Sequence, residues 1–272
     1  MKKIKKELYS IQNYKKAFAF ALKAHGTQTT PNGLPYSFHI VNVANEVINS
    51  LFFHKLSYDE ANIAIACALL HDVEEDTNYK INSYDLDIDN FDEIKAGVEV
   101  LTKNETLPSK QEQMKDSLER LKKMPDCIQI VKLADRITNL DPAPPFWNRA
   151  KREAYVDEAK MILEALKNSN SYLAQKLQEK IDTYQVEYKD DFLVFYTLED
   201  KYLILDKSHK NYLTTFKAIN RLNKKIKFFK EFRNVSKKDI QNFKDKIDLD
   251  KFISQVDSDD KRLKKIDKKV VL

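Results

Sequence analysis

Glycine is almost absent from this 272-residue chain, which contains only Gly26, Gly33 and Gly97. Phosphate-binding loops of the P-loop and Rossmann types need several glycines close together, so the composition excludes both kinds of site. Two of the three glycines lie in the segment between His25 and Tyr36. Their position predicts that this loop contains backbone conformations that residues with a Cβ atom rarely adopt.

Long apolar runs are also missing. No stretch of about 18 uncharged apolar residues occurs, so we expect no membrane-spanning helix. The N-terminal sequence "MKKIKKELYSIQNYKKAFAF" is basic, but lysines interrupt its apolar residues, so we expect no signal peptide. Cys67 and Cys127 lie within apolar segments, which predicts two core residues and no disulfide framework. We therefore expect a cytoplasmic protein.

Negative charge is scarce toward the end of the chain. Residues 207–272 contain 20 Lys and Arg but 9 Asp and Glu, a net charge of +11, whereas the whole chain carries +5. This excess suits contact with nucleic acid or with an acidic protein. A lysine-rich amphipathic helix with one solvated face would have the same composition, and no known nucleic-acid-binding motif is present.

Helical periodicity dominates residues 1–185, which we expect to form an all-α domain. Ser57 and Glu60 have the spacing of a capping box, so one helix is expected to start there and continue to Asp76. The other helical segments include "NYKKAFAFALKAH", "IVNVANEVINSLFF", "FDEIKAGVEVLTK", "KQEQMKDSLERLKKM", "DCIQIVKLADRITNL", "NRAKREAYVDEAKMILEAL" and "NSYLAQKLQEKIDTYQ".

Residues 186–272 have a different pattern and form a basic C-terminal extension in our interpretation. The segment "FLVFYTLEDKYLILD" is rich in aromatic and branched residues and has a charged break at residues 199–201, which predicts a β-hairpin. Two lysine-rich segments with helical spacing follow, "YLTTFKAINRLNKKIKFFKEF" and "SKKDIQNFKDKI". Ser236 is expected to cap the second helix.

The stretch "CALLHDVEEDTNY" places a histidine and several acids at the end of an apolar segment. Successive residues of a helix advance by about 100° around its axis. On a continuous helix His71, Asp72, Glu75 and Asp76 would therefore share one face beside the apolar stripe. Glu74 would lie off this face, so we expect it to be solvated.

Two further polar residues stand where an ordinary core would have none. His39 begins one helical segment, and Asp135 lies in the middle of the apolar run "IVKLADRITNL", four residues before Asn139. Taken singly, a histidine is commonly a hydrogen-bonded core residue, and Asp135 could pair with Arg136. Histidine and carboxylate side chains on successive helices together indicate a divalent metal site, because two ligands from one helix are too few.

The order "H…HDxxED…KLADRxxNL" resembles the HD-domain metal-dependent phosphohydrolases. It is most similar to the alarmone hydrolase domain of the RelA/SpoT type and its small stand-alone relatives. The resemblance covers about residues 10–180 through "AFALKAHGTQ", "GLPYSFHI", "LLHDVEEDT", "VLTKNETLP", "VKLADRITNL" and "NSNSYLAQKL". It implies an all-α HD-domain helical bundle.

The resemblance also implies roles for single residues. One divalent ion, manganese first and iron, cobalt, nickel or zinc as alternatives, would be held by His39, His71, Asp72 and Asp135. Glu75 and Asp76 would handle the attacking water and the leaving group. Asn139 would contact the phosphate or orient the site, and His25 would anchor the neighbouring loop.

The implied reaction is removal of the 3′-pyrophosphate from (p)ppGpp-type alarmones, which are small nucleotides. The family usually has basic residues in the loop after the first histidine, but no Lys or Arg occurs between Gly26 and His39. Lys132, Arg136 and Tyr155 are our candidates for substrate contacts. An adenine alarmone, an NADPH-like dinucleotide, or a nucleotide sensor without catalysis remain alternatives, and the sequence leaves the oligomeric state open.

Overall fold

The computed structural model describes residues 7–141, 143–144, 147, 149–184, 191–236, 240–255 and 265–272. These residues form two compact units. One unit comprises residues Met1–Pro142 and Tyr155–Tyr184, and the other comprises Ala143–Ala154 and Gln185–Leu272. The boundary predicted between residues 185 and 186 lies outside the described residues, so it stays a prediction.

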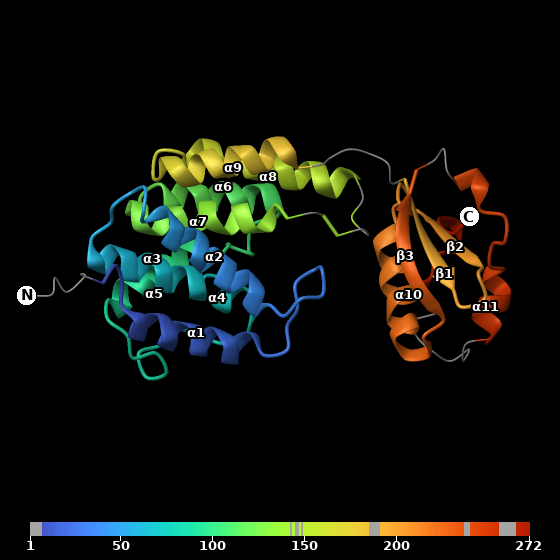
Figure 1. The fold of residues 1–272 in the computed structure, drawn as a ribbon, viewed down its shortest axis with the longest axis horizontal. Coiled ribbons are helices and arrows are strands. Elements are labelled where there is room, and N and C mark those ends of the chain that lie inside the picture. The colour runs from blue at the N-terminus through green and yellow to red at the C-terminus, as the bar shows by residue number, and fades with distance from the viewer. Residues whose placement is uncertain are drawn as a thin grey trace, which may run out of the picture. The chain divides into compact units, whose positions relative to one another are not determined.

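The first unit is helical, which confirms the predicted fold class (Figure 1). Side-chain caps mark several helix starts, including the predicted capping box of Ser57 and Glu60. In its described part the helices are α1 (Ile11–His25), α2 (Ser37–Ser50), α3 (Tyr58–Leu70), α4 (Val73–Asp76), α5 (Phe91–Leu101), α6 (Lys110–Leu121), α7 (Asp126–Asn139), the part of α8 (Arg149–Leu166) from Tyr155 onward, and α9 (Ser171–Thr183).

Helix α3 is the central element of this unit. Every residue from Ala61 to Leu70 is buried, and the helix packs against α1, α2, α5 and α7. Alanines recur along α3, so other backbones can approach it closely. The contact with α5 is close, since a Cβ atom on Gly97 would lie 2.7 Å from Cys67 Sγ and 2.6 Å from Ile128 Cδ1. Small residues on α3 and α5 thus bring the neighbouring helices close together.

The second unit contains a small antiparallel sheet with the strand order β2-β1-β3. Strands β1 (Phe192–Thr197) and β2 (Tyr202–Asp206) form the predicted β-hairpin, and Asp200 in its turn has a φ of 56°. One helix prediction was too long. Helix α10 (Tyr212–Ile226) ends where Lys227 adopts a φ of 50°, and β3 (Phe229–Val235) follows and pairs with β1.

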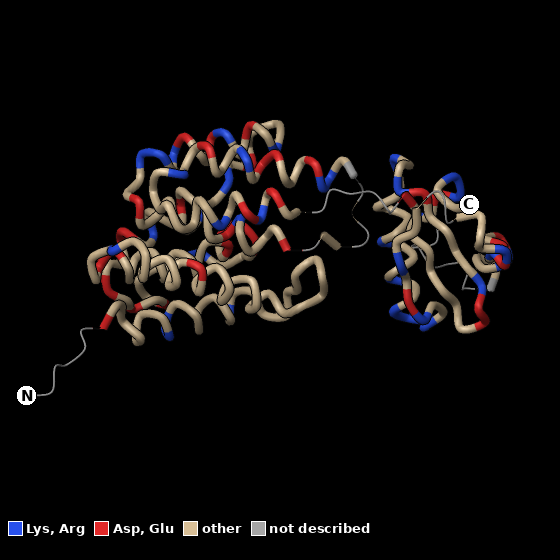
Figure 2. The backbone as a smooth tube through the Cα atoms, turned by 45° about the horizontal axis from the view of Figure 1, so that its top comes forward, with Lys and Arg blue, Asp and Glu red and all other residues tan. Residues whose placement is uncertain are grey.

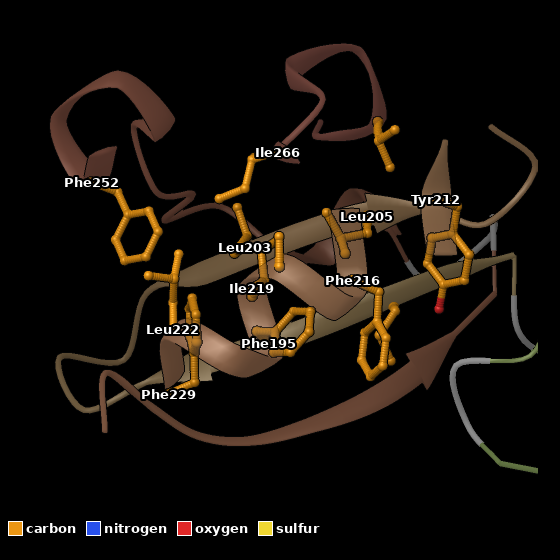
Figure 3. Close-up of a cluster of buried hydrophobic side chains, with 13 residues drawn as sticks. Phe195, Leu203, Leu205, Tyr212, Phe216, Ile219, Leu222, Phe229, Phe252 and Ile266 are labelled. Carbon is orange, nitrogen blue, oxygen red and sulfur yellow. The ribbon is translucent and has the colours of Figure 1, made fainter. Parts of the chain in front are cut away.

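Each face of the sheet has its own apolar core. Leu193 and Phe195 on β1 pack toward α10 and α11 (Leu249–Gln255), as Figure 3 shows for most of this cluster. Phe192 and Val194 point to the other face, where Phe243 covers them after the short 3₁₀ helix η1 (Ile240–Asn242). The helix predicted from Ser236 is represented in the described residues only by η1, because residues 237–239 lie outside them.

The end of the chain closes the outer edge of β2. The amide of Ile247 donates to the carbonyl of Tyr202 at 2.9 Å, and the amide of Leu272 donates to the carbonyl of Ile204 at 3.0 Å. The last helical turn is the 3₁₀ helix η3 (Lys268–Val270). These contacts satisfy backbone groups that an open sheet edge would expose.

Two predictions about the whole chain can be compared with the structure. Both cysteines are free and buried, as predicted. None of the helices in the described part of the chain combines the length and the apolar character that crossing a bilayer requires.

Candidate metal centre

Polar side chains from three separate segments meet beside α3. His39 comes from α2, while His71 and Asp72 lie between α3 and α4. The His39 and His71 Nε2 atoms are 3.3 Å apart, and Asp72 Oδ2 lies 3.4 Å from the first and 2.9 Å from the second. These three residues form a group that could hold a metal ion.

Asp135 of α7 lies against the same two imidazoles. Its Oδ1 atom lies 3.5 Å from His39 Nε2 and 3.7 Å from His71 Nε2. Two imidazole nitrogens and two carboxylate oxygens therefore converge on one small volume. This set of donors suits a divalent cation of the first transition row.

The helix is interrupted between α3 and α4, and this interruption allows the adjacent residues His71 and Asp72 to face the same metal-binding group. The sequence predicted one helix from Ser57 to Asp76, but α3 ends at Leu70, His71 caps it, and α4 starts at Val73. Asp72 between them has φ −99° and ψ −2°. On a continuous helix, side chains at successive positions would diverge by about 100°.

The same break corrects the prediction for Glu74, which was expected to be solvated. Its Oε1 atom accepts a hydrogen bond from the amide of Ile81 at 2.9 Å, and its Oε2 atom lies 3.6 Å from Lys80 Nζ. Its side chain is 13% exposed. Through this hydrogen bond Glu74 connects α4 to the loop that follows it.

Both imidazoles are oriented through their Nδ1 atoms. His71 Nδ1 donates to the carbonyl of Ala68 at 2.8 Å. His39 Nδ1 lies 3.3 Å from Thr138 Oγ1, whose hydroxyl donates to the Asp135 carbonyl at 2.9 Å, so the hydroxyl oxygen accepts from the histidine. Each ring thereby presents Nε2 to the cluster, as metal-binding histidines commonly do.

Helix α7 holds the Asp135 carboxylate from two sides. Lys132 Nζ lies 3.0 Å from Oδ2, and the Asn139 amide donates to Oδ1. The residues are three and four positions apart, so they share one helix face. Lys132 was predicted to contact substrate, but its side chain is 7% exposed and its visible partner is this carboxylate.

The two neighbouring acids have different partners. Lys103 binds both Glu75 oxygens, with Nζ at 2.6 Å from Oε1 and the backbone amide at 3.2 Å from Oε2. The Tyr36 hydroxyl lies 2.9 Å from Asp76 Oδ2 and 2.5 Å from Asp72 Oδ2. Glu75 is thus paired with the Lys103 ammonium, whereas the Tyr36 hydroxyl connects Asp76 to Asp72.

Tyr36, Lys103 and Thr138 were not predicted as site residues. Tyr36 had a detectable signal, because it lies three residues before His39 and such positions share a helix face. Its ring stacks on His25 with the centroids 4.5 Å apart, and His25 Nδ1 is 2.8 Å from Gln28 Oε1. This packing holds Tyr36 at the base of the loop that follows α1.

The pKa values reflect this crowding. Burial, the largest influence, disfavours the charged imidazole, but hydrogen bonds to Asp135 and Asp72 outweigh it and raise the pKa of His39 to about 9. Burial also disfavours the charged form of His71, but the negative charge of Asp72 outweighs this effect, and the pKa of His71 rises to about 10. The paired charges keep the pKa of Asp72 and Asp135 well below the usual range despite burial. Binding of a metal ion at the Nε2 atoms would therefore require the imidazoles to release protons.

Two other predicted residues lie between α7 and α8. Arg136 is buried, its Nη2 lies 2.9 Å from Glu158 Oε2, and its guanidinium carbon is 4.7 Å from the Tyr155 ring centroid. Burial raises the pKa of Tyr155 to about 12, so its hydroxyl is protonated. Their predicted contacts with substrate stay predictions.

The loop between α1 and α2 has the unusual backbone that its glycines predicted. Gly26 has a φ of 50° and Gly33 a φ of 83°. The carbonyl of Leu34 accepts from the amide of Thr30 at 2.8 Å, which closes a tight turn. No Lys or Arg occurs in this loop, so a substrate phosphate would find no positive side chain on it.

Comparisons with known proteins agree with this arrangement. Residues 17–169 match the sequence model of the HD domain. A Drosophila melanogaster protein named guanosine-3′,5′-bis(diphosphate) 3′-pyrophosphohydrolase MESH1 is 29% identical over 155 residues, which span 55% of this chain and 80% of the relative. The Danio rerio protein of the same name is 27% identical over 174 residues, or 59% and 87% of the two chains.

The fold is also similar to a solved structure. That structure is described as a metazoan orthologue of SpoT that hydrolyses ppGpp, and the TM-score is 0.54 at 24% sequence identity. The similarity covers 66% of this chain and 99% of the other. At this level of identity the likeness concerns the fold.

Proposed function

Because the chain belongs to the HD-domain family, we propose that it is a metal-dependent hydrolase that removes the 3′-pyrophosphate from ppGpp-type alarmones. The convergence of His39, His71, Asp72 and Asp135 on one point carries this proposal. The names of the fly and fish relatives support the choice of substrate. The two free, buried cysteines agree with a cytoplasmic location.

The four converging residues are our proposed metal ligands. Manganese is our first choice, and iron, cobalt, nickel or zinc would accept the same imidazole and carboxylate donors. When bound, such an ion lowers the pKa of a water molecule and stabilises charge on phosphate oxygens. Asn139 and Lys132 orient the Asp135 carboxylate toward it.

Glu75 and Asp76 divide the proton transfers in this proposal. Lys103 Nζ lies 2.6 Å from Glu75 Oε1 and holds this carboxylate in place, which suits a group that orients and deprotonates the attacking water. Burial and the charge of Asp72 raise the pKa of Asp76, which suits a group that gives a proton to the leaving oxygen. Both acids lie within four residues of the proposed ligand Asp72, so in this proposal both are near the substrate phosphate.

The loop between α1 and α2 favours a second candidate substrate. It lacks the basic residues with which the family usually grips a guanine nucleotide. An adenine alarmone or an NADPH-like dinucleotide would fit the same metal chemistry. Lys132, Arg136 and Tyr155 are our proposed contacts to either substrate.

A nucleotide panel tests the proposal. The metal-stripped protein is incubated with ppGpp, an adenine alarmone and NADPH, each with and without Mn²⁺, and the products are separated by chromatography. We expect pyrophosphate release from ppGpp that requires the metal and is abolished by a chelator. Turnover of another nucleotide alone would select the second candidate. Tight nucleotide binding without turnover under every metal would contradict catalysis and identify a sensor.

Replacing Tyr36 by phenylalanine tests how the site is held. The substitution removes the hydroxyl between Asp72 and Asp76 and keeps the ring on His25. Loss of such an outer hydrogen bond commonly lowers metal affinity or activity by about 10–100-fold. We expect a fall of that size in kcat and in the apparent affinity for Mn²⁺, measured from initial rates, with a smaller change in KM.

The control is Tyr84→Phe, since the Tyr84 side chain is 100% exposed. This variant should match the wild type in kcat and in Mn²⁺ dependence. If Tyr36→Phe also matched the wild type in both quantities, its hydroxyl would have no positioning role.

A further inference from the structure

The second compact unit has a concentration of positive charge that the proposed hydrolase site does not use. Between Lys207 and Ser236 the chain contains nine Lys and Arg and one acid, Glu231. Basic and acidic positions are interspersed along the helical unit, whereas α10 contains no acidic residue (Figure 2). Four of the nine bases lie on α10 with no acid among them, so this helix has the clearest concentration of positive charge.

The basic side chains of α10 point to solvent because the opposite face of the helix packs in the apolar core. Tyr212, Phe216, Ile219 and Leu222 are buried against the sheet (Figure 3). At about 100° and 1.5 Å per residue, the exposed bases occupy an arc of about 100° and span about 12 Å along the axis. We call this face the α10 basic surface and define it by Lys217, Arg221, Lys224 and Lys225.

No described residue forms an ion pair with the α10 basic surface. Lysines on the helical unit behave differently, since Lys122, Lys160 and Lys167 each lie within 3.6 Å of an acid three positions away. Like charges four residues apart, such as Arg221 with Lys217 and with Lys225, destabilise a helix slightly. These bases therefore do not stabilise α10. Their clustering on one exposed face is explained if they bind a negatively charged partner.

The chemistry of the surface selects the partner. A protein partner would need a buried apolar anchor, and no aromatic or large aliphatic side chain stands among the four bases. Insertion into a bilayer would need the apolar face of α10, which is buried against the sheet. Nucleic acid needs neither, because phosphate contacts supply most of its non-specific affinity.

We propose that the α10 basic surface binds nucleic acid through its phosphate groups. Three of the four side chains are lysines, which bind phosphate as point charges. The single arginine, Arg221, could pair with a guanine edge, but one such contact does not read a base sequence. The contact is therefore independent of base sequence and open to RNA and DNA alike. Affinities of this kind lie at about 10⁻⁶ to 10⁻⁴ M and fall steeply with salt.

The test measures binding of the full chain to two labelled probes by fluorescence anisotropy. The probes are a single-stranded RNA of about 20 nucleotides and a DNA duplex of about 20 base pairs, each longer than the contact itself. We expect binding at about 50 mM salt. For four phosphate contacts on the single strand, raising the salt to about 200 mM should weaken binding by about 50-fold.

The informative variant replaces Lys217, Arg221, Lys224 and Lys225 together by alanine. Alanine is the best helix former, so α10 is expected to stay folded, which circular dichroism and the unfolding midpoint verify. The matched control replaces Lys110, Lys115, Lys122 and Lys123, four exposed lysines on or beside α6, and removes the same charge. We expect the α10 variant to bind at least about 20-fold more weakly and the control to stay within about threefold of the wild type.

Two results would overturn the proposal. One is equal weakening in both variants, which would show a response to net charge alone. The other is absence of binding by the wild type to either probe at low salt. In that case, binding to phosphatidylserine vesicles that depends on the four bases would assign the surface to a membrane.

Discussion

Replacing Asp72 by alanine is expected to abolish metal-dependent pyrophosphate release, with kcat/KM falling at least about 10³-fold. Asp72 Oδ2 lies within 3.4 Å of both imidazole Nε2 atoms and accepts from Tyr36. The substitution removes one proposed ligand together with the group that joins the metal-binding cluster to Asp76. A loss of about 4 kcal/mol in transition-state stabilisation corresponds to this factor.

The measurement is the initial rate on ppGpp as Mn²⁺ is titrated, together with calorimetric titration of the metal alone. Asp59→Ala is the control, because Asp59 is exposed in the first turn of α3. It should keep the wild-type rate and metal affinity. An Asp72→Ala variant within about tenfold of the wild type at saturating metal would place catalysis elsewhere.

Replacing Lys132 by methionine is expected to lower the free energy of unfolding of the metal-free protein by about 3–5 kcal/mol. The Lys132 and Asp135 side chains are each 7% exposed and lie 3.0 Å apart. Methionine fills a similar volume but removes the ammonium whose charge is the largest favourable influence on the buried Asp135 carboxylate. Such a loss of one member of a buried pair is among the most damaging single changes.

Urea unfolding at neutral pH measures this effect, with and without Mn²⁺. Saturating metal should reduce the difference from the wild type, because a bound cation also compensates the Asp135 charge. Lys123→Met, at an exposed position, should change the free energy of unfolding by no more than about 0.5 kcal/mol. If Lys132→Met were equally mild without metal, the pair would not stabilise the fold.

Local pattern was sufficient to predict the helices and the hairpin. Their signals, apolar periodicity and a capping box, are contained within each segment. Strand β3 was missed because "KIKFFKEF" also has helical spacing, and its stability as a strand depends on pairing Phe232 with Phe195. That partner is distant in sequence, and the left-handed conformation of Lys227 that ends α10 gave no local signal.

The residues that we propose as metal ligands were identified from the sequence, whereas the side chains that support them were not. His39 and Asp135 were detectable because polar side chains within apolar segments need a reason. The helical wheel placed Glu74 in solvent because it assumed an unbroken helix through Asp72. The hydrogen bonds of Lys103 with Glu75 and of His39 with Thr138 join segments that only the folded chain brings together.

The interruption between α3 and α4 has a consequence for anyone who would transplant this centre. Val73 is fully buried and the Thr77 hydroxyl donates to its carbonyl at 2.7 Å, so both ends of the short segment are anchored. A His-Asp dipeptide placed at the end of an ordinary helix would aim its side chains about 100° apart. The segment to transplant is therefore residues 70–77 with their backbone conformation. A designed scaffold must reproduce this bend for both side chains to reach one metal ion.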